Sequence, residues 1–236
     1  MPMLGVSVAR AALLAGCLAL FVAAAARIPA ELDLMAQTGR DPALVYLRVD
    51  AAPLVFAPAP SVRAQRAQMA DCDDLMVSVF AQLRRGAPAE KVAAACLARA
   101  EAILQTSPSS SAAHLVRAGA FRTLGQPQDM VDSLLLSHRL ARHEGWLAAR
   151  RLRLAFAAGE VSALTALRQA LGADVAVVLS SEAYLPQLVQ MYRRNVDQRQ
   201  WITDIVGAAD QADQRRFLKG LRKAAAEANN NAEAGS

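Results

Sequence analysis

Residues 111–125 read SAAHLVRAGAFRTLG, and residues 145–159 read GWLAARRLRLAFAAG. Both are rich in alanine and leucine, the first begins at a serine cap, and each ends at a glycine, the residue that most often terminates helices. A further helical stretch follows each of the two glycines. The sequence therefore predicts consecutive helical hairpins and an all-α fold.

The composition favours the same fold. Of the 236 residues, 54% are hydrophobic and only 5% are aromatic, and alanine supplies much of the apolar fraction. Small side chains let helices approach closely, whereas sheets favour β-branched and aromatic residues. With 20% charged residues, the chain can also build a core, which argues against disorder.

Apolar stripes and turn residues divide the rest of the chain. Prolines from Pro29 to Pro60 predict a spacer, with one short helix at 31–37 and an extended segment at 45–49. Asp174 is expected to cap the apolar run 175–179. The expected body helices are 62–85, 89–105, 109–125, 127–142, 146–158, 161–171, 184–194, 198–206 and 211–226. We therefore expect a membrane anchor or signal segment at 1–27, a spacer at 28–60, a helical domain at 61–227 and a disordered tail at 228–236.

The spacing of the glycines points to a repeat. Gly125 and Gly159 lie 34 residues apart, which is the tetratricopeptide period. Ala118 and Phe121 supply the small and aromatic residues that this family places before its inter-helix glycine, and Pro108 resembles its closing proline. Residues 88–172 thus resemble tetratricopeptide-like repeats, which implies stacked antiparallel hairpins. The match is degenerate: His114 and Met130 depart from the pattern, the next repeat has Leu152 and Ala155, and Gly86 precedes Gly125 by 39 residues.

The N-terminus contains an uncharged segment, AALLAGCLALFVAAAA at 11–26, between Arg10 and Arg27. As a helix it would be about 24 Å long, slightly shorter than a ~30 Å hydrocarbon core. We interpret it as a retained transmembrane anchor. A cleaved signal peptide and a lipoprotein processing box around Cys17 stay open as alternatives. Since a segment this near the N-terminus usually exports the chain on its C-terminal side, we expect a bacterial inner-membrane protein with a single span and a periplasmic body.

A second resemblance covers more of the chain. The anchor, the cysteine-bearing hairpin, the helix start GWLAAR at 145–150 and the blocks AYLPQLVQMYRRNVDQRQWI at 183–202 and FLKGLR at 217–222 are similar to membrane-anchored accessory proteins of bacterial exopolysaccharide clusters. This resemblance implies a partner in an envelope polysaccharide synthesis or export complex and no assigned catalytic residue.

The cysteines offer one candidate cross-link. Cys72 and Cys96 could form a disulfide between the first two helices in an oxidising compartment, although a hairpin turning at Gly86 would offset them by roughly 7 Å along the axis, at ~1.5 Å per residue. Buried free thiols are the alternative. Cys17 lies in the apolar segment and is expected to be inert.

No constellation of residues predicts chemistry. His138 and His143 are five positions apart and so do not share a helix face as zinc ligands four apart do. Asp71, Asp73 and Asp74 are interpreted as helix-dipole partners. With no phosphate loop, nucleophile elbow or acid–base pair of carboxylates, we expect no enzyme activity, no cofactor and no metal.

Positive charge suggests two surfaces. Arg150, Arg151 and Arg153 could line a groove for an acidic partner or could form a solvated outer face. The chain carries a net charge of +5, with a basic cluster near the C-terminus interpreted as a solvated helix face. No aromatic side chains alternate with these charges, so no nucleic-acid partner is expected.

These observations predict a membrane-tethered helical adaptor that binds another protein. Two alternatives stay open: a periplasmic polysaccharide-binding or hydrolytic domain, for which Glu160, Glu182 and Trp146 would have to converge, and an adaptor that faces the cytoplasm.

Overall fold

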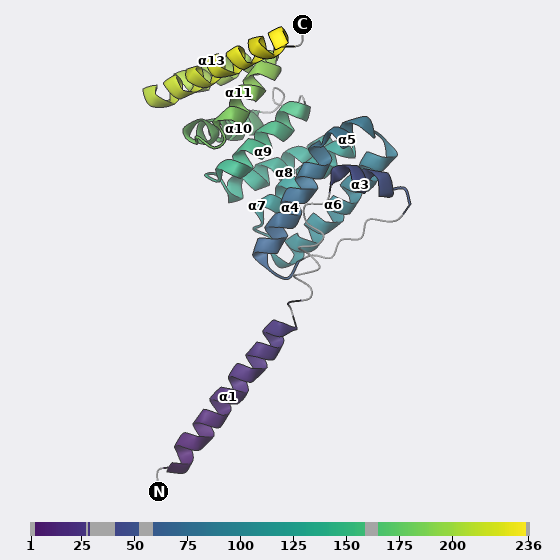
Figure 1. Cartoon of the computed structure of the whole chain (residues 1–236), viewed down its shortest axis with the longest axis vertical. Helices are drawn as coiled ribbons and strands as arrows, with labels where there is room; N and C mark the ends of the chain where they lie inside the picture. Colours follow the sequence, from purple (N-terminus) through teal and green to yellow (C-terminus); the bar gives the residue numbers. More distant parts are fainter. Residues whose placement is uncertain (1–2, 27, 29–40, 52–58, 159–164, 235–236) are drawn as a thin grey trace.

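The computed structural model describes residues 3–26, 28, 41–51, 59–158 and 165–234 (Figure 1). Over these ranges the secondary structure is helical and contains no strand, so the all-α prediction is confirmed. The helices are α1 (Met3–Ala25), α3 (Pro42–Arg48), α4 (Val62–Val77), α5 (Val79–Leu83), α6 (Ala87–Thr106), α7 (Ser111–Thr123), α8 (Pro127–Leu140), α9 (Gly145–Ala158), α10 (Thr165–Ser180), α11 (Leu185–Arg194), the 3-10 helix η2 (Val196–Gln198), α12 (Arg199–Gly207) and α13 (Gln211–Ala234).

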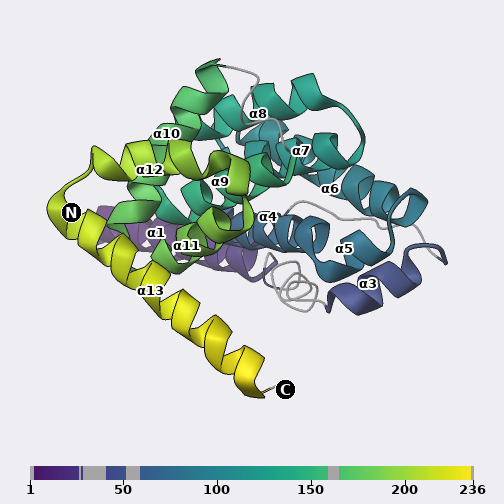
Figure 2. The same cartoon turned by 90° about the horizontal axis from the view of Figure 1, so that it is seen from above.

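The body helices pack as pairs that follow one another through the molecule. α4 packs on α6, α7 on α8 and α9 on α10, and α11 leads into α12 and α13. The first helices of the pairs, α4, α7, α9 and α11, also contact one another in that order, as do α8, α10 and α12. The result is a layered array that runs from α3 and α6 at one end to α13 at the other (Figures 1 and 2).

Small side chains make this packing possible. Ala118, Ala148 and Ala155 are fully buried at contacts between helices, and Leu115, Leu152 and Leu171 fill the space around them. Because alanine adds little bulk, neighbouring helix axes can approach closely.

The first predicted helix, 62–85, is divided in two. Ser78 has an extended conformation (φ −62°, ψ 159°) and ends α4, while its hydroxyl oxygen accepts a hydrogen bond of 3.2 Å from Ala81 N at the start of α5. A serine that caps the helix following it, as Ser78 does for α5, favours a break between two helices over one continuous helix.

The prediction of two helices at 161–171 and 175–179 is wrong. α10 runs without interruption through Gly172 and Asp174, and residues 161–164 lie outside the described ranges. Gly172 faces Ile205 and Trp201 of α12, so it is a packing residue inside a helix. Asp174 is fully buried and is no cap.

Part of the predicted spacer belongs to the body. The extended segment expected at 45–49 is instead the helix α3, which Asp41 caps and Pro42 begins. Tyr46 is 1% exposed, and its hydroxyl donates a hydrogen bond of 3.3 Å to Leu75 O of α4. The helix expected at 31–37 lies outside the described residues.

The described segments nearest the two termini are helices. α13 continues to Ala234, through most of the tail expected to be disordered. α1 extends away from the body (Figure 1). Its large apolar side chains are exposed; for example, Leu14 is 68% exposed and Phe21 is 71% exposed. Within the ranges described, none of the helices combines the length and the apolarity needed to span a membrane.

Candidate functional site

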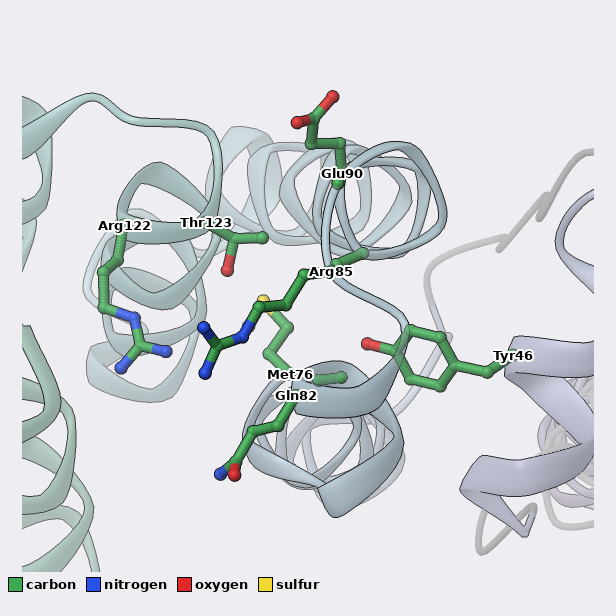
Figure 3. A pocket seen from close by; sticks show the side chains of 10 residues that line it. Tyr46, Met76, Gln82, Arg85, Glu90, Arg122 and Thr123 are labelled. Atoms are coloured by element: carbon green, nitrogen blue, oxygen red, sulfur yellow. The ribbon is translucent and has the colours of Figure 1, made fainter.

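Three adjoining cavities lie in a row along the body of the molecule. The first, of about 290 Å³, lies between α3, α5, α6 and α7 (Figure 3). The central cavity, of about 460 Å³, shares Met76, Gln82 and Arg122 with the first. The third, of about 590 Å³, shares Phe156, Arg194 and Asn195 with the central one. Because neighbouring cavities share lining residues, the three lie side by side in a row, which we call the A groove.

The walls of the central cavity combine three kinds of side chain. Met76, Phe156 and Met191 are among its apolar residues. Its amides are Gln82, Gln187, Gln190 and Asn195. Of the described residues that line it, the ionisable ones are Arg122, Arg153 and Arg194. The middle of the A groove therefore offers apolar contact, hydrogen-bonding amides and positive charge.

Acidic side chains occur at both ends of the A groove. Glu90 lines the first cavity together with Arg85 and Arg122. Asp197 and Asp204 line the third with Arg168, whose guanidinium lies 5.5 Å from the ring centroid of Trp201. The excess of positive charge is thus confined to the middle of the groove and to its first cavity.

Arg122 lies at the junction of two cavities. Burial lowers the pKa of its guanidinium, against the opposing attraction of Asp73. Its Nη1 atom is inaccessible to solvent and has no hydrogen-bond partner among the described residues. A buried donor without a partner costs free energy, so the guanidinium of Arg122 is incompletely satisfied where it lines the two cavities.

An ion cluster lies beneath the groove and joins α4 to α9. Asp73 is 2% exposed and accepts a hydrogen bond of 2.7 Å from Arg150 Nη1 and another from Arg153 Nη2. Arg150 Nη2 also donates to Asp74 at 3.2 Å. Burial raises the pKa of the Asp73 carboxyl, while the two arginines oppose that shift. Two carboxylates face two guanidiniums here, so the cluster is close to neutral.

This cluster corrects the interpretation of the acidic residues. Asp73 and Asp74 lie in the second half of α4, far from its N-terminus at Val62, so the helix dipole does not explain them. Arg150 and Arg153 are their partners. Asp73 and Arg153 are 80 positions apart in the sequence, so no local sequence pattern predicts this contact.

The three arginines proposed as one partner surface are separated by the fold. Arg153 lines the A groove, and Arg150 lies beside it with 20% of its side chain exposed. Arg151 has no exposed surface and so contributes to no surface. The burial of Arg151 could be predicted in part from the sequence, because Arg151 lies four residues after Leu147 and three before Leu154, both of which are buried.

Arg151 belongs to a polar cluster that ties α8, α9 and α10 together. Its Nε and Nη2 donate to the two carboxylate oxygens of Asp174 at 2.8 and 2.7 Å. Its remaining donors reach Ser137 and the carbonyl of Ala141. His138 Nδ1 lies 3.1 Å from Asp174 Oδ1. The buried charges are therefore paired and hydrogen-bonded, as burial requires.

A disulfide joins α4 to α6. Cys72 and Cys96 are fully buried, and their Cα atoms lie 5.6 Å apart. The offset expected from a hairpin turning at Gly86 does not arise, because α4 already ends at Val77 and α5 continues in a different direction. Cys17 is a free, exposed thiol on α1.

The other candidate residues do not assemble into a site. Trp146 Nε1 donates to Glu144 at 2.8 Å, while Glu160 lies outside the described residues. His114 Nε2 lies 3.1 Å from the carbonyl of Pro108. In the described part of the chain, no three histidine, cysteine, aspartate or glutamate side chains gather as metal ligands would.

Comparison with protein-family models, with curated proteins and with solved structures finds no match to this chain. Its function is therefore inferred from the molecule's own geometry.

Proposed function

We propose that this protein is a membrane-associated helical adaptor that binds a segment of another protein in the A groove. The observation that carries the proposal is the row of three adjoining cavities, whose walls include residues of α5, α7, α9 and α11. A row of cavities that spans several helices suits an extended chain better than a compact small molecule.

The walls of the groove support a peptide ligand. Gln82, Gln187 and Gln190 each offer both a donor and an acceptor, and the backbone of an extended peptide needs both. Met76 and Met191 can adjust to different side chains, as methionines do at adaptable binding surfaces. The proposal assigns no catalytic step to these residues.

The geometry of the hairpins supports a tetratricopeptide-like array. Gly125 ends the first helix of its pair in the left-handed region (φ 73°), where glycine is favoured. Ala118 is fully buried and Phe121 is 8% exposed, in keeping with the small and aromatic positions of the resemblance. We therefore propose that the first helices line the concave side of a short solenoid.

The proposed tether is α1. From Ala11 to Ala25 its sequence is uncharged, and its large apolar side chains are exposed. Such a helix gains free energy by entering a lipid phase. Its uncharged part is shorter than the hydrocarbon core, and the side chain of Arg10 can extend towards the headgroups. The Cys72–Cys96 disulfide supports a body in an oxidising compartment, which in a bacterium is the periplasm.

The second resemblance suggests where the partner works. We propose that it belongs to an envelope polysaccharide synthesis or export complex, because the anchor, the cysteine-bearing hairpin and the C-terminal block are similar to proteins of exopolysaccharide clusters.

Site-specific photo-crosslinking in the native membrane tests the proposal. A photoreactive amino acid replaces Gln190, an exposed residue of the groove, or Lys219, an exposed residue of α13 that serves as the matched control. We expect a discrete crosslinked protein from position 190 and none from position 219. Recovery of the uncrosslinked chain alone from position 190 would refute the adaptor function.

Thiol labelling without reductant separates the two orientations. In the periplasmic orientation Cys72 and Cys96 stay unlabelled after denaturation, because the disulfide blocks them. Full labelling of both cysteines would place the body on the cytoplasmic side.

A further inference from the structure

We infer that the body of this protein rests on the surface of a lipid bilayer through α3 and α5, whose exposed apolar side chains enter the lipid between anionic headgroups. This inference rests on the proposed function, in which α1 is the membrane tether, and it adds a second lipid contact and an orientation of the body. Its basis is the distribution of exposed apolar side chains, the charges beside them and the length of chain that joins them to α1.

The exposed apolar side chains of the body are concentrated on two short helices. Nine large apolar residues of the described body are exposed, and five of them lie on α3 or α5. We call these five the apolar patch: Leu44, Leu47, Val79, Phe80 and Leu83. The other four lie on four different helices. Single exposed apolar residues are normal on a protein surface, whereas a concentration of them marks an interaction site.

The two helices of the apolar patch are neighbours. α3 and α5 contact each other, and Figures 1 and 2 show them side by side at the edge of the body. Leu44 and Leu47 are three positions apart on α3, and Val79 and Leu83 are four positions apart on α5. Residues at these spacings share one face of a helix, so each helix presents an apolar face to its surroundings.

The packing of the body does not account for this pattern. α3 buries Val45 and Tyr46, yet its opposite face is also apolar, and Leu47 on that face is 67% exposed. α5 contains no buried residue, although three of its five residues belong to the apolar patch. A helix that is apolar on all sides is normally covered on all sides. We therefore infer that a second apolar phase covers the patch.

Basic side chains lie beside the apolar patch. Arg84 Nη2 and Lys91 Nζ lie 2.8 and 2.9 Å from the two carboxylate oxygens of Asp50. Arg48 is exposed in the last turn of α3. Three cations and one carboxylate therefore meet near the C-terminal end of α3. Apolar side chains flanked by basic ones are typical of a surface that lies in the interface of a bilayer with anionic lipids.

Other charges near the apolar patch do not reverse this excess. Arg85 and Glu90 both line the first cavity and offset each other. Asp41 lies at the opposite end of α3, where its carboxylate accepts a hydrogen bond of 2.9 Å from Ala43 N and caps the helix. Within their own bounds, α3 and α5 contain no acidic residue.

The length of chain between α1 and α3 keeps the apolar patch near the bilayer that holds α1. Residues 26–41 separate the two helices. A fully extended chain spans ~3.3–3.6 Å per residue, so α3 begins at most about 58 Å from the end of α1. Contact of the patch with lipid is then an intramolecular event at high effective concentration, for which a small contact area is sufficient.

The apolar patch is small for an interface between two copies of the chain. α3 has 7 residues and α5 has 5, whereas a stable protein interface takes ~20–30 residues from each partner. A bilayer needs no complementary shape and accepts a patch of any outline. We therefore choose the lipid as the occupant, and a second copy of the chain becomes an outcome of the test.

Contact through the apolar patch orients the array. α3 lies at one end of the array and α13 at the other (Figures 1 and 2), so α13 is directed away from the bilayer. The first cavity, whose walls include Tyr46 of α3 and Gln82 of α5, lies next to the lipid surface.

Quenching by lipid measures the contact in the full-length protein. A single cysteine replaces Leu47 or Leu83 in chains that also carry Cys17→Ser, and the fluorescent dye NBD is attached without reductant. Each chain is inserted alone into a nanodisc of phosphatidylcholine and phosphatidylglycerol with doxyl quenchers on the acyl chains. The matched control is Val196→Cys on η2, because Val196 is 62% exposed and Leu47 is 67% exposed.

We expect the doxyl lipids to quench the dye at positions 47 and 83 and to leave it unquenched at position 196. Replacing phosphatidylglycerol by phosphatidylcholine should reduce the quenching at positions 47 and 83, because the basic side chains then face no net negative charge. Equal quenching at positions 47 and 196 would overturn the inference.

A second set of variants tests the native side chains, because a dye can draw its own position into lipid. The dye is placed at Leu44→Cys, and Leu47→Glu with Leu83→Glu removes apolar contact on both helices. The matched control is Val196→Glu with Leu218→Glu, two exposed residues outside the patch. We expect quenching at position 44 to be lost in the first pair and unchanged in the second, while thermal melts show that both stay folded. Quenching that survives the change of Leu47 and Leu83 would overturn the inference.

The remaining outcomes separate a second copy and the proposed function from this inference. Energy transfer between labelled chains in discs that hold two, without doxyl quenching at position 47, would assign the apolar patch to a second copy. The native Cys17, which is exposed on α1, reports on the tether when it carries the same dye. A dye quenched at position 17 but not at positions 47 and 83 would overturn only the patch, whereas a dye unquenched at position 17 would refute the tether. The photo-crosslink from position 190 tests the adaptor function independently of both.

Discussion

Removing the carboxylate of Asp174 should strongly destabilise the body. Asp174 and Arg151 both have no exposed surface, and they share two hydrogen bonds of 2.8 and 2.7 Å. The change Asp174→Ala removes both bonds, and it leaves the guanidinium buried without a counter-ion.

The expected loss in the free energy of unfolding follows from these contacts. Two charge-assisted hydrogen bonds contribute ~1.5–3 kcal/mol each, and breaking a buried ion pair from one side costs ~3–5 kcal/mol. Both considerations give a loss of about 4 kcal/mol in the free energy of unfolding. For a domain of this size, each kcal/mol lowers Tm by ~2–4 °C. The variant should therefore melt about 8–16 °C below the wild type.

A double-mutant cycle separates the pair from its surroundings. Arg151→Met combined with Asp174→Leu removes both charges and keeps apolar volume in place, so the double variant should lie within ~1–2 kcal/mol of the wild type. The exposed pair Lys223–Glu227, 3.9 Å apart with side chains 78% and 63% exposed, provides the control: Glu227→Ala should cost under ~1 kcal/mol.

Urea denaturation followed by far-UV circular dichroism measures each variant. If Asp174→Ala proved as stable as Glu227→Ala, Arg151 would have to reach water in the native state. The buried cluster would then be no determinant of stability, and the close packing of α8, α9 and α10 around it would be wrong.

Three further predictions concern the disulfide, pH and one glycine. Replacing Cys72 and Cys96 by serine should lower the free energy of unfolding by roughly 3.5 kcal/mol, the loop entropy for a separation of 24 residues; dithiothreitol should lower that of the wild type in urea melts and leave the double variant unchanged. Burial lowers the pKa of His114 from 6.5, against a hydrogen bond to Pro108 that raises it and with a smaller contribution from Arg117. The folded state therefore binds fewer protons than the unfolded state, so stability is full above pH ~6.5 and falls as the pH drops through the lowered pKa; His114→Gln should flatten this dependence in melts between pH 7.5 and 5, and an unchanged slope would show that other groups cause it. Gly86 has φ 81° and ψ −141°, a conformation that is essentially restricted to glycine, so Gly86→Ala should cost ~1–3 kcal/mol, whereas Gly207→Ala, with no atom within 4 Å of the added carbon, should cost nothing measurable by calorimetry.

Helix boundaries set by local chemistry were predictable from sequence. Gly125 ends α7, Pro127 begins α8 and Ser110 caps α7, because caps and terminators act through the backbone of their own neighbours. The predictions were wrong where a local signal served tertiary packing. Gly172 resembled a terminator but lies inside α10 against α12, and Asp174 resembled a cap but pairs with Arg151.

The A groove could not be predicted in the same way. Its arginines come from positions 85, 122, 153, 168 and 194, which have no common sequence motif. Arg153 was noticed only because it lies in an arginine-rich run, and that run places Arg151 in the core and Arg150 on an ion cluster. Adjacent residues on a helix point in different directions, so a cluster in sequence need not be a cluster in space.

The amino-acid sequence by itself determined that this chain is helical, where most of its helices begin and end, and that its N-terminal helix is apolar. These properties depend on side-chain size, caps and hydrophobic content, which act over a few residues. Only the tertiary structure decided which charges are buried in pairs and which line the A groove. The burial of a charge depends on partners brought from distant positions, and the free energy of each pair depends on the water that packing removes.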